Sequence, residues 1–359
     1  MTTQFRASPL LRDRAIPHVP ARHPESATAF TDIDLDASGR QVGFLHIPHS
    51  PHDDAWGTVR IPLAVLANGE GPTVVLEGGN HGDEYEGQIV LGELIRDLPL
   101  DRVRGRLIFV PSLNAPAADA GLRTSPHDGK NLNRCFPGDH AGTITEQIAA
   151  YVSDELFSRG DAFLSLHSGG SSLDIVPSAL VQPSSDPTQT QRNLDAVQAF
   201  GAPFNVLLST LGETRMSVAA AVAAGLTCVS TEMAGRGTVT DDALALCRAG
   251  TRRVLVHWGV LDAVWAEVEP VAPVAPAPLL QVTGAKSYVI APDRGVFEAY
   301  HRVGATVRAG QPAGCVHQIF DPQRAPVELH YGADGVLFAK RHPGAVVPGN
   351  VCCVVATAA

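Results

Sequence analysis

The chain has 359 residues and a formal net charge of −10, with 27 Lys and Arg against 37 Asp and Glu. Hydrophobic residues make up 45% of it and charged residues 18%, which is typical of a globular protein with a substantial core. The acidic balance and the lack of any Lys/Arg run argue against nucleic acid as a partner. A chain of this length accommodates two domains, or one large domain with an appendage.

The cysteines and the apolar runs indicate the cellular compartment of the protein. Six cysteines form no CxxC pair, and two of them, Cys352 and Cys353, are adjacent, so a disulfide framework is not expected. Residues 1–20 lack the continuous apolar core of a signal peptide. No stretch of about 18 uncharged apolar residues predicts a membrane span. We therefore expect a cytoplasmic protein with reduced thiols and no membrane partner.

Along the chain, residues 1–40 are expected to form an arm followed by a strand or two, and residues 41–268 an α/β domain. In this domain short apolar runs alternate with helical patterns, which is typical of a mixed sheet flanked by helices. The expected strands cover Thr73–Leu76, Arg106–Pro111, Ala162–His167, Phe204–Leu208 and Thr227–Thr231. The expected helices cover Glu86–Leu98, Thr145–Leu156, Thr188–Phe200, Ser217–Ala224 and Asp241–Trp265.

The carboxyl-terminal part has a different composition. Residues 269–278 are rich in Pro and Ala and are expected to form an extended linker. Residues 279–359 are rich in Val and Gly, with turn residues at short intervals, which predicts a small all-β domain. Its turn pattern resembles a lipoyl-like barrel-sandwich. No carrier lysine stands out, and we expect Lys286 and Lys340 to be ordinary surface residues.

The segment Gly78–Glu84 carries the strongest functional signal. It follows the apolar run Thr73–Leu76 and precedes a helical pattern, so His81 and Glu84 lie on a glycine-rich turn at the carboxyl end of a strand. Ligands of open α/β sheets bind at that edge. Imidazole nitrogen and carboxylate oxygen are both good zinc ligands, and a catalytic zinc takes three protein ligands and a water. This pair supplies two of the three.

His167 is the candidate for the third ligand. It also ends an apolar run, Phe163–Leu166, and stands just before glycines. Two strand ends of one sheet can bring their side chains together at the same edge. The alternative is a hydrogen-bonded structural histidine, which is the commoner fate of a histidine at a strand end.

Two arginines are candidates for binding an anionic group. Arg134 follows Asn133, and Arg123 lies upstream in the same segment, 114–142, which is expected to have little regular structure. A guanidinium binds a carboxylate through two parallel hydrogen bonds, and a neighbouring amide adds orientation. The alternative is that both arginines are solvated surface residues. Long ordered loops in compact domains tend to be functional, which favours binding.

Glu232 is the candidate general base. It ends the apolar run Cys228–Thr231, and a buried glutamate is costly unless it is paired or functional. Beside an activated water it could accept a proton and pass it to a leaving amine. The alternative is a structural glutamate held by an ion pair.

In this order the motifs resemble the succinylglutamate desuccinylase/aspartoacylase family, which is related to zinc carboxypeptidases. The resemblance runs through roughly residues 50–260, and a trailing β domain is also typical of the family. One branch, the N-acetyl-2,4-diaminobutyrate deacetylases of ectoine breakdown, is the most similar. The matching segments are Ser50–Gly57, Gly78–Gly87 and Arg123–Pro126. One departure is Ser165, where many relatives have an Asp, which puts in doubt a carboxylate contact to His167.

The resemblance implies a zinc-carboxypeptidase-like fold with one Zn²⁺ per chain, bound by His81, Glu84 and His167. It also implies that Glu232 acts as general base and then general acid. Arg123 would stabilise the tetrahedral oxyanion together with the metal. The α-carboxylate of a small N-acyl amino acid would be held by Asn133 and Arg134.

The expected reaction is removal of the acetyl group from N-α-acetyl-L-2,4-diaminobutyrate. The side-chain ammonium of this substrate calls for an acidic contact, with Asp53, Asp54, Glu86 and Asp174 as candidates. An N-acetylaspartate or N-succinylglutamate type of substrate remains an alternative within the same chemistry. A non-catalytic lipoyl-like carrier is the alternative from another class. A homo-oligomer is compatible with the sequence, which does not decide the oligomeric state.

Overall fold

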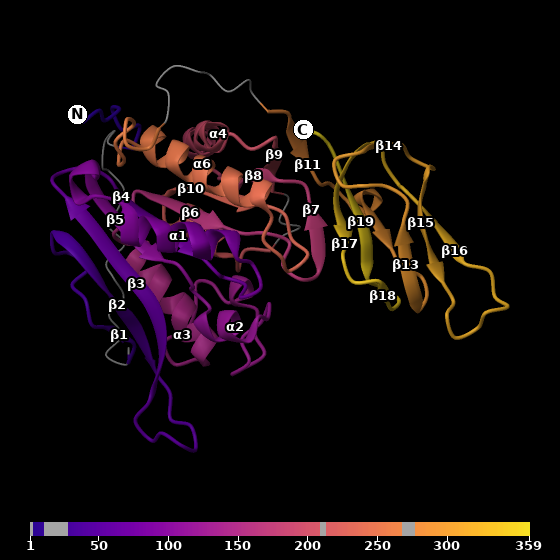
Figure 1. The fold of residues 1–359 in the computed structure, drawn as a ribbon, viewed down its shortest axis with the longest axis horizontal. Helices are drawn as coiled ribbons and strands as arrows, with labels where there is room; N and C mark the ends of the chain where they lie inside the picture. The colour runs from indigo at the N-terminus through magenta and orange to yellow at the C-terminus, as the bar shows by residue number, and fades with distance from the viewer. Residues whose placement is uncertain (1–2, 11–27, 209–212, 268–276) are drawn as a thin grey trace.

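The computed structural model describes residues 3–10, 28–208, 213–267 and 277–359 (Figure 1). Residues 11–27 of the expected arm and residues 269–276 of the expected linker lie outside the described part. In the described ranges, none of the helices is long and apolar enough to cross a membrane.

A continuous mixed sheet runs through the described part of the molecule (Figure 1). At its centre β5, β4, β6 and β10 are parallel neighbours, so their carboxyl ends lie at one edge. The antiparallel strands β2 and β3 extend it on one side, and β8 pairs with β10 on the other. The strands on its main path are β1 (Phe30–Thr31), β2 (Gly39–Pro48), β3 (Thr58–Asn68), β5 (Gly105–Val110), β4 (Thr73–Gly78), β6 (Ala162–Leu166), β10 (Thr227–Glu232), β8 (Ser178–Val181), β9 (Phe204–Leu207), β11 (Leu279–Gln281), β19 (Val351–Ala358), β17 (Gly335–Arg341) and β14 (Thr306–Val307).

Helices cover both faces of the central strands. Successive strand residues point to opposite faces: Val74 and Leu76 pack into one buried cluster, and Val75 packs into the other. The first cluster is closed by α1 (Glu86–Asp97), α4 (Pro187–Phe200) and α6 (Asp241–His257), and the second by α3 (Ile144–Tyr151) and α5 (Ser217–Ala223). The expected α/β architecture with a mixed sheet and flanking helices is therefore confirmed.

The structure differs from the sequence expectations in three respects. The last helix of this domain ends at His257 rather than Trp265, because Gly259 has a φ of 75° and leaves the helical region. Of the strands before residue 260, the long hairpin β2–β3 and the short strands β7 (Leu173–Ile175) and β8 were not among the expected strands. The segment 114–142 is more regular than expected, with α2 (Ala115–Ala120) and a short 3₁₀ helix at Leu132–Arg134.

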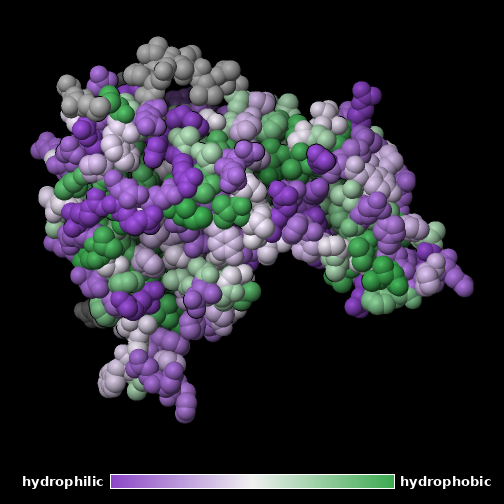
Figure 2. Space-filling model, viewed as in Figure 1, coloured by the Kyte–Doolittle hydropathy of each residue, from purple (hydrophilic) through white to green (hydrophobic). Residues whose placement is uncertain are grey.

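The carboxyl-terminal β domain has its own core. A second sheet, in the order β16 (Val327–His330), β15 (Pro312–His317), β13 (Gly295–Ala299) and β18 (Ala345–Val346), packs against β12 (Tyr288–Ile290), β14, β17 and β19. The domain also joins the catalytic sheet: β7 (Leu173–Ile175) pairs with β17, and β9 pairs with β11. A further apolar cluster, which includes Ile175, Val206 and Phe338, fills this junction. Figure 2 shows the concave outline between the two parts.

Candidate metal centre

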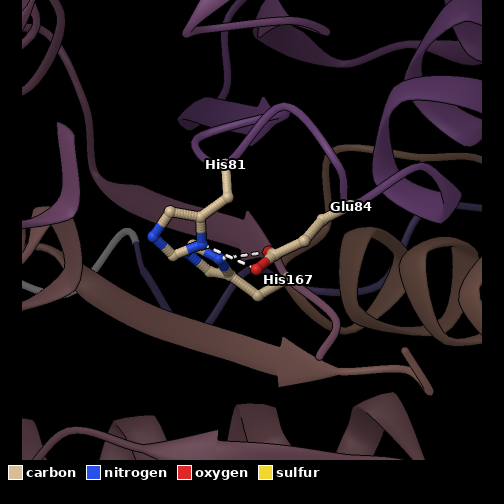
Figure 3. Close-up of side chains that lie close together, drawn as sticks. All are labelled: His81, Glu84 and His167. Atoms are coloured by element: carbon tan, nitrogen blue, oxygen red, sulfur yellow. Dashed lines mark hydrogen bonds and ion pairs between the residues drawn. The ribbon is translucent and has the colours of Figure 1, made fainter. Parts of the chain in front are cut away.

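The sheet brings the three predicted ligands together. His81 and Glu84 follow β4, and His167 follows β6, its parallel neighbour, in which Gly78 is paired with Leu166. The two turns therefore leave the sheet at the same edge and side by side. Figure 3 shows the three side chains converging there.

The ligand atoms converge on Glu84. Its Oε1 lies 2.6 Å from His81 Nδ1, and its Oε2 lies 2.8 Å from His167 Nδ1. All the ligand atoms of the trio lie within 4.8 Å of one another. Only 4%, 3% and 7% of the side chains of His81, Glu84 and His167 are exposed. The trio thus forms a compact and nearly dry donor set.

Glycines allow the two turns to approach so closely. A Cβ on Gly82 would lie 2.0 Å from the carbonyl carbon of Ala117 in α2, so a larger residue would force these segments apart. On the other turn, Gly170 has a φ of 54°, and a Cβ there would lie 2.7 Å from Asp83 Oδ2. The same Asp83 oxygen accepts a hydrogen bond from the Ser171 backbone N–H at 2.7 Å and ties the two turns together.

The tautomer of His81 follows from its neighbours. Asn131 Oδ1 accepts the backbone N–H of Asn133 at 2.9 Å and lies 3.1 Å from His81 Nε2. Because that amide atom is an oxygen, Nε2 must donate, which leaves Nδ1 with a lone pair in the neutral ring. Two acceptors, Nδ1 and the Glu84 carboxylate, then face each other at 2.6 Å. A cation between these two acceptors would turn the contact into a favourable one, so the residues fit a bound metal ion.

Glu77, the last-but-one residue of β4, brings a carboxylate near His167. Its Oε1 lies 3.9 Å from His167 Nε2, on the ring side away from Glu84. The same oxygen accepts hydrogen bonds from Ser165 Oγ at 2.6 Å, Ser217 Oγ at 2.7 Å and Asn80 Nδ2 at 3.1 Å. Ser165 therefore orients a carboxylate from the neighbouring strand instead of supplying one itself.

Burial and charge act against each other inside the centre. Burial alone would raise the pKa of the Glu84 carboxyl, but His81 and His167 outweigh it and hold the pKa well below its usual range. Burial lowers the pKa of His81. For His167 burial also acts downward, but the Glu84 carboxylate beside it outweighs burial and raises its pKa.

Arg123 stands at the exposed side of the centre. Its Nη1 lies 3.3 Å from His81 Nδ1 and 3.4 Å from Glu84 Oε1. Of its side chain 40% is exposed, so solvent reaches the centre from this side. A guanidinium here adds positive charge next to the ligand atoms.

Glu232 ends β10, beside β6. Burial, followed by the charge of Glu84, raises the pKa of its carboxyl, and its negative charge in turn raises the pKa of His167. Glu232 Oε2 is buried and has no hydrogen-bond partner among the described residues. A carboxylate in this state is disposed to hold a proton.

Asn133 and Arg134 lie next to the centre, and each already contacts another residue of the protein. The Asn133 side-chain oxygen accepts the Ser217 backbone N–H at 2.9 Å. Arg134 Nε lies 3.5 Å from Glu213 Oε2, and 41% of its side chain is exposed. The positive charge of Arg123 acts on the Arg134 guanidinium, so the two guanidiniums lie in the same region of the site.

The four acidic residues that are candidates for binding a substrate ammonium differ in their exposure and in their partners. Asp53 and Asp54 are exposed in the β2–β3 hairpin. Asp174 is ion-paired with Arg236 and Lys340. Glu86, at the start of α1, is 1% exposed, and burial raises its pKa although Ser168 and nearby backbone N–H groups act in the opposite direction.

Sequence reasoning missed the residues that support the ligands: Glu77, Asn80, Asn131 and Ser217. A charged residue at the end of an apolar run is a usable signal for Glu77, and Asn131 belongs to the same motif as Asn133 and Arg134. Ser217 gives no such signal, because only the fold brings α5 next to β4.

Comparisons with known proteins identify the family of the chain. Residues 70–258 match the model of the succinylglutamate desuccinylase/aspartoacylase catalytic domain. The chain is 41% identical over 333 residues to the N-α-acetyl-L-2,4-diaminobutyric acid deacetylase of Halomonas elongata, covering 93% of this chain and 95% of that one.

Solved structures extend the comparison to the fold. The product-bound ectoine utilization protein EutE of Ruegeria pomeroyi is 37% identical, with a TM-score of 0.87 over 92% of this chain and 99% of that one. A succinylglutamate desuccinylase/aspartoacylase from Rhodobacter sphaeroides is 38% identical, with a TM-score of 0.86 over the same shares. The chain therefore belongs to the succinylglutamate desuccinylase/aspartoacylase family.

Proposed function

We propose that this chain is a zinc-dependent amidohydrolase that removes the acetyl group from N-α-acetyl-L-2,4-diaminobutyrate and releases acetate and the free amine. The observation that carries the proposal is the convergence of His81, Glu84 and His167 beside Arg123. The substrate is supported by the 41% identity to the Halomonas elongata deacetylase over 93% of the chain.

The chemical nature of the three ligands indicates which metal ion the centre would bind. Two imidazoles and one carboxylate, with partners on the outer nitrogen of each ring, match the three-ligand sets of catalytic zinc sites. A zinc ion in such a site acidifies water and polarises a carbonyl oxygen. His81, Glu84 and His167 would hold one ion per chain.

Arg123 and Glu232 carry the steps that the chain itself performs. Arg123 points its Nη1 at the ligand edge and is partly open to solvent, so it can donate to the oxygen that becomes negative as the amide is attacked. Glu232, with its raised pKa, accepts the proton of the attacking water and delivers it to the leaving amine.

Charged side chains around the centre would orient the substrate. Arg134, with Asn133 beside it, would bind the α-carboxylate, and to do so it would exchange its contact with Glu213 for the substrate. Of the acidic candidates, Glu86 is the best placed for the side-chain ammonium, since it is buried, forms no ion pair among the described residues and is close enough for its charge to act on Glu232. The six free cysteines support work in a reducing cytoplasm.

The test is acetate release from a panel of substrates. We expect the highest kcat/KM with N-α-acetyl-2,4-diaminobutyrate, a lower value with N-acetylnorvaline, which lacks the ammonium, and little turnover of N-acetylaspartate or N-succinylglutamate. Preference for either of the last two would move the chain to another substrate and keep the metal chemistry. No turnover of any of them by zinc-loaded protein would overturn the proposal.

A further inference from the structure

A second cluster of metal-binding side chains lies in the carboxyl-terminal β domain, far along the chain from the centre described above. Glu298, Cys315 and His317 bring a carboxylate oxygen, a thiol sulfur and an imidazole nitrogen within 4.8 Å of one another. His317 Nε2 lies 2.7 Å from Glu298 Oε2 and 3.3 Å from Cys315 Sγ, and that sulfur lies 3.6 Å from Glu298 Oε2.

The strand register builds this cluster. Glu298 of β13 is paired with Cys315 of β15, and Cys315 is paired on its other side with Glu328 of β16. His317 follows Cys315 by two residues, so both side chains lie on the same face of the sheet. The ligands therefore stand on hydrogen-bonded strands, which fix their relative positions better than a loop would.

The separations suit a tetrahedral ion. With bonds of about 2.0–2.3 Å to nitrogen, oxygen and sulfur, the ligand atoms of a tetrahedral zinc site lie roughly 3.3–3.8 Å apart. The two distances to Cys315 Sγ already lie in this range. Only the contact between His317 and Glu298 must open, by less than about 1 Å, and both side chains are partly exposed and free to move.

We propose that Glu298, Cys315 and His317 form a second metal site, selective for zinc-like divalent transition ions. A thiolate with an imidazole excludes Mg²⁺ and Ca²⁺, which prefer all-oxygen sets. Glu328, opposite Cys315, or a water completes the coordination. Glu328 now contacts His330 at 2.8 Å and would exchange that contact for the ion.

The state of the side chains agrees with this assignment. The Glu298 carboxylate lies against both His317 and Cys315, so its oxygen already points into the cluster. Cys315 is 5% exposed, but its sulfur faces the two polar partners and not the apolar core alone. An ion here would link β13, β15 and β16.

Cobalt substitution separates this site from the catalytic one, because none of His81, Glu84 and His167 carries sulfur. Full-length reduced protein is freed of metal and titrated with Co²⁺. We expect a near-ultraviolet thiolate-to-cobalt absorption band that saturates with binding of a second ion per chain and is displaced by Zn²⁺. Cys315→Ser should abolish the band and the second ion, and His317→Gln should weaken both.

The controls address other sulfurs and the fold. Cys135→Ser, at the one cysteine that is half-buried and not fully buried, should keep the band. Cys315→Ser should keep the circular dichroism and the hydrolase activity of the parent, since it lies outside the catalytic domain. A protein that binds a single ion and gives no thiolate band, or a band that survives Cys315→Ser, would show that the cluster is only a hydrogen-bonded trio.

Discussion

The two clusters of metal-binding side chains differ most in their surroundings. At the sheet edge, His81, Glu84 and His167 are at most 7% exposed, and buried charge must be balanced within the protein. On the β domain, the Glu298 and His317 side chains are 57% and 42% exposed, so water moderates every charge. The buried centre therefore needs a supporting network of polar groups, while the exposed cluster depends on the identity of its own ligands.

Removing a ligand from the buried centre should give the largest effect. In His167→Ala the bound zinc should fall by about one ion per chain, and acetate release should fall with it, because two ligands remain where catalytic sites use three. Metal analysis and an acetate assay on the same sample measure both. Undiminished zinc in this variant would mean that the ion binds elsewhere.

Glu232→Gln separates the metal from the proton transfer. The variant should keep its zinc, since Glu232 is not a ligand, while kcat falls by roughly 10²–10⁴, the usual range for losing a general base. Glu155→Gln, in the π-helical turn Val152–Leu156 after α3, is a matched control expected to leave kcat unchanged. Equal loss of zinc and activity in Glu232→Gln would assign Glu232 to the metal instead.

Glu77→Gln tests the supporting network directly. Zinc affinity should fall about 10–100-fold, since the carboxylate that orients His167 becomes neutral. Adding Ser165→Asp to this variant should restore part of the affinity, because it places a carboxylate two residues before His167 on the same strand face. Competition with a zinc chelator measures both. An unchanged affinity in Glu77→Gln would leave the 3.9 Å contact without a role.

The last effect, similar in size to that of Glu77→Gln, should be one of substrate choice. In Glu86→Gln, kcat/KM for N-α-acetyl-2,4-diaminobutyrate should fall relative to kcat/KM for N-acetylnorvaline. The loss should correspond to about 1.5–3 kcal/mol of transition-state stabilisation, which is the contribution of a hydrogen bond to a charged group. Asp174→Asn is the matched control, since Asp174 is already paired with Arg236 and Lys340. Equal losses on both substrates would remove Glu86 from the ammonium site.

The sequence predicted the parts of the fold and the site that are local. Apolar runs gave the central strands, and glycine-flanked polar residues at two strand ends gave His81, Glu84 and His167. In the hairpin β2–β3, β2 has an alternating pattern with few consecutive buried residues, which hides it, whereas the buried run Leu63–Ala67 of β3 was a usable signal that the sequence prediction did not use. No spacing along the chain encodes directly which strands and helices become neighbours. The contacts of Glu77, Ser217 and the Glu298–Cys315 pair depend on those neighbours, so the sequence alone does not reveal them.

The most direct test of the central claim is to titrate the metal-free protein with zinc while following acetate release from N-α-acetyl-2,4-diaminobutyrate. Activity should rise in proportion to zinc and level off near one ion per chain, because the dry centre of His81, Glu84 and His167 fills before the exposed cluster. Full activity before any zinc is added, with the chelator still present, would contradict the account.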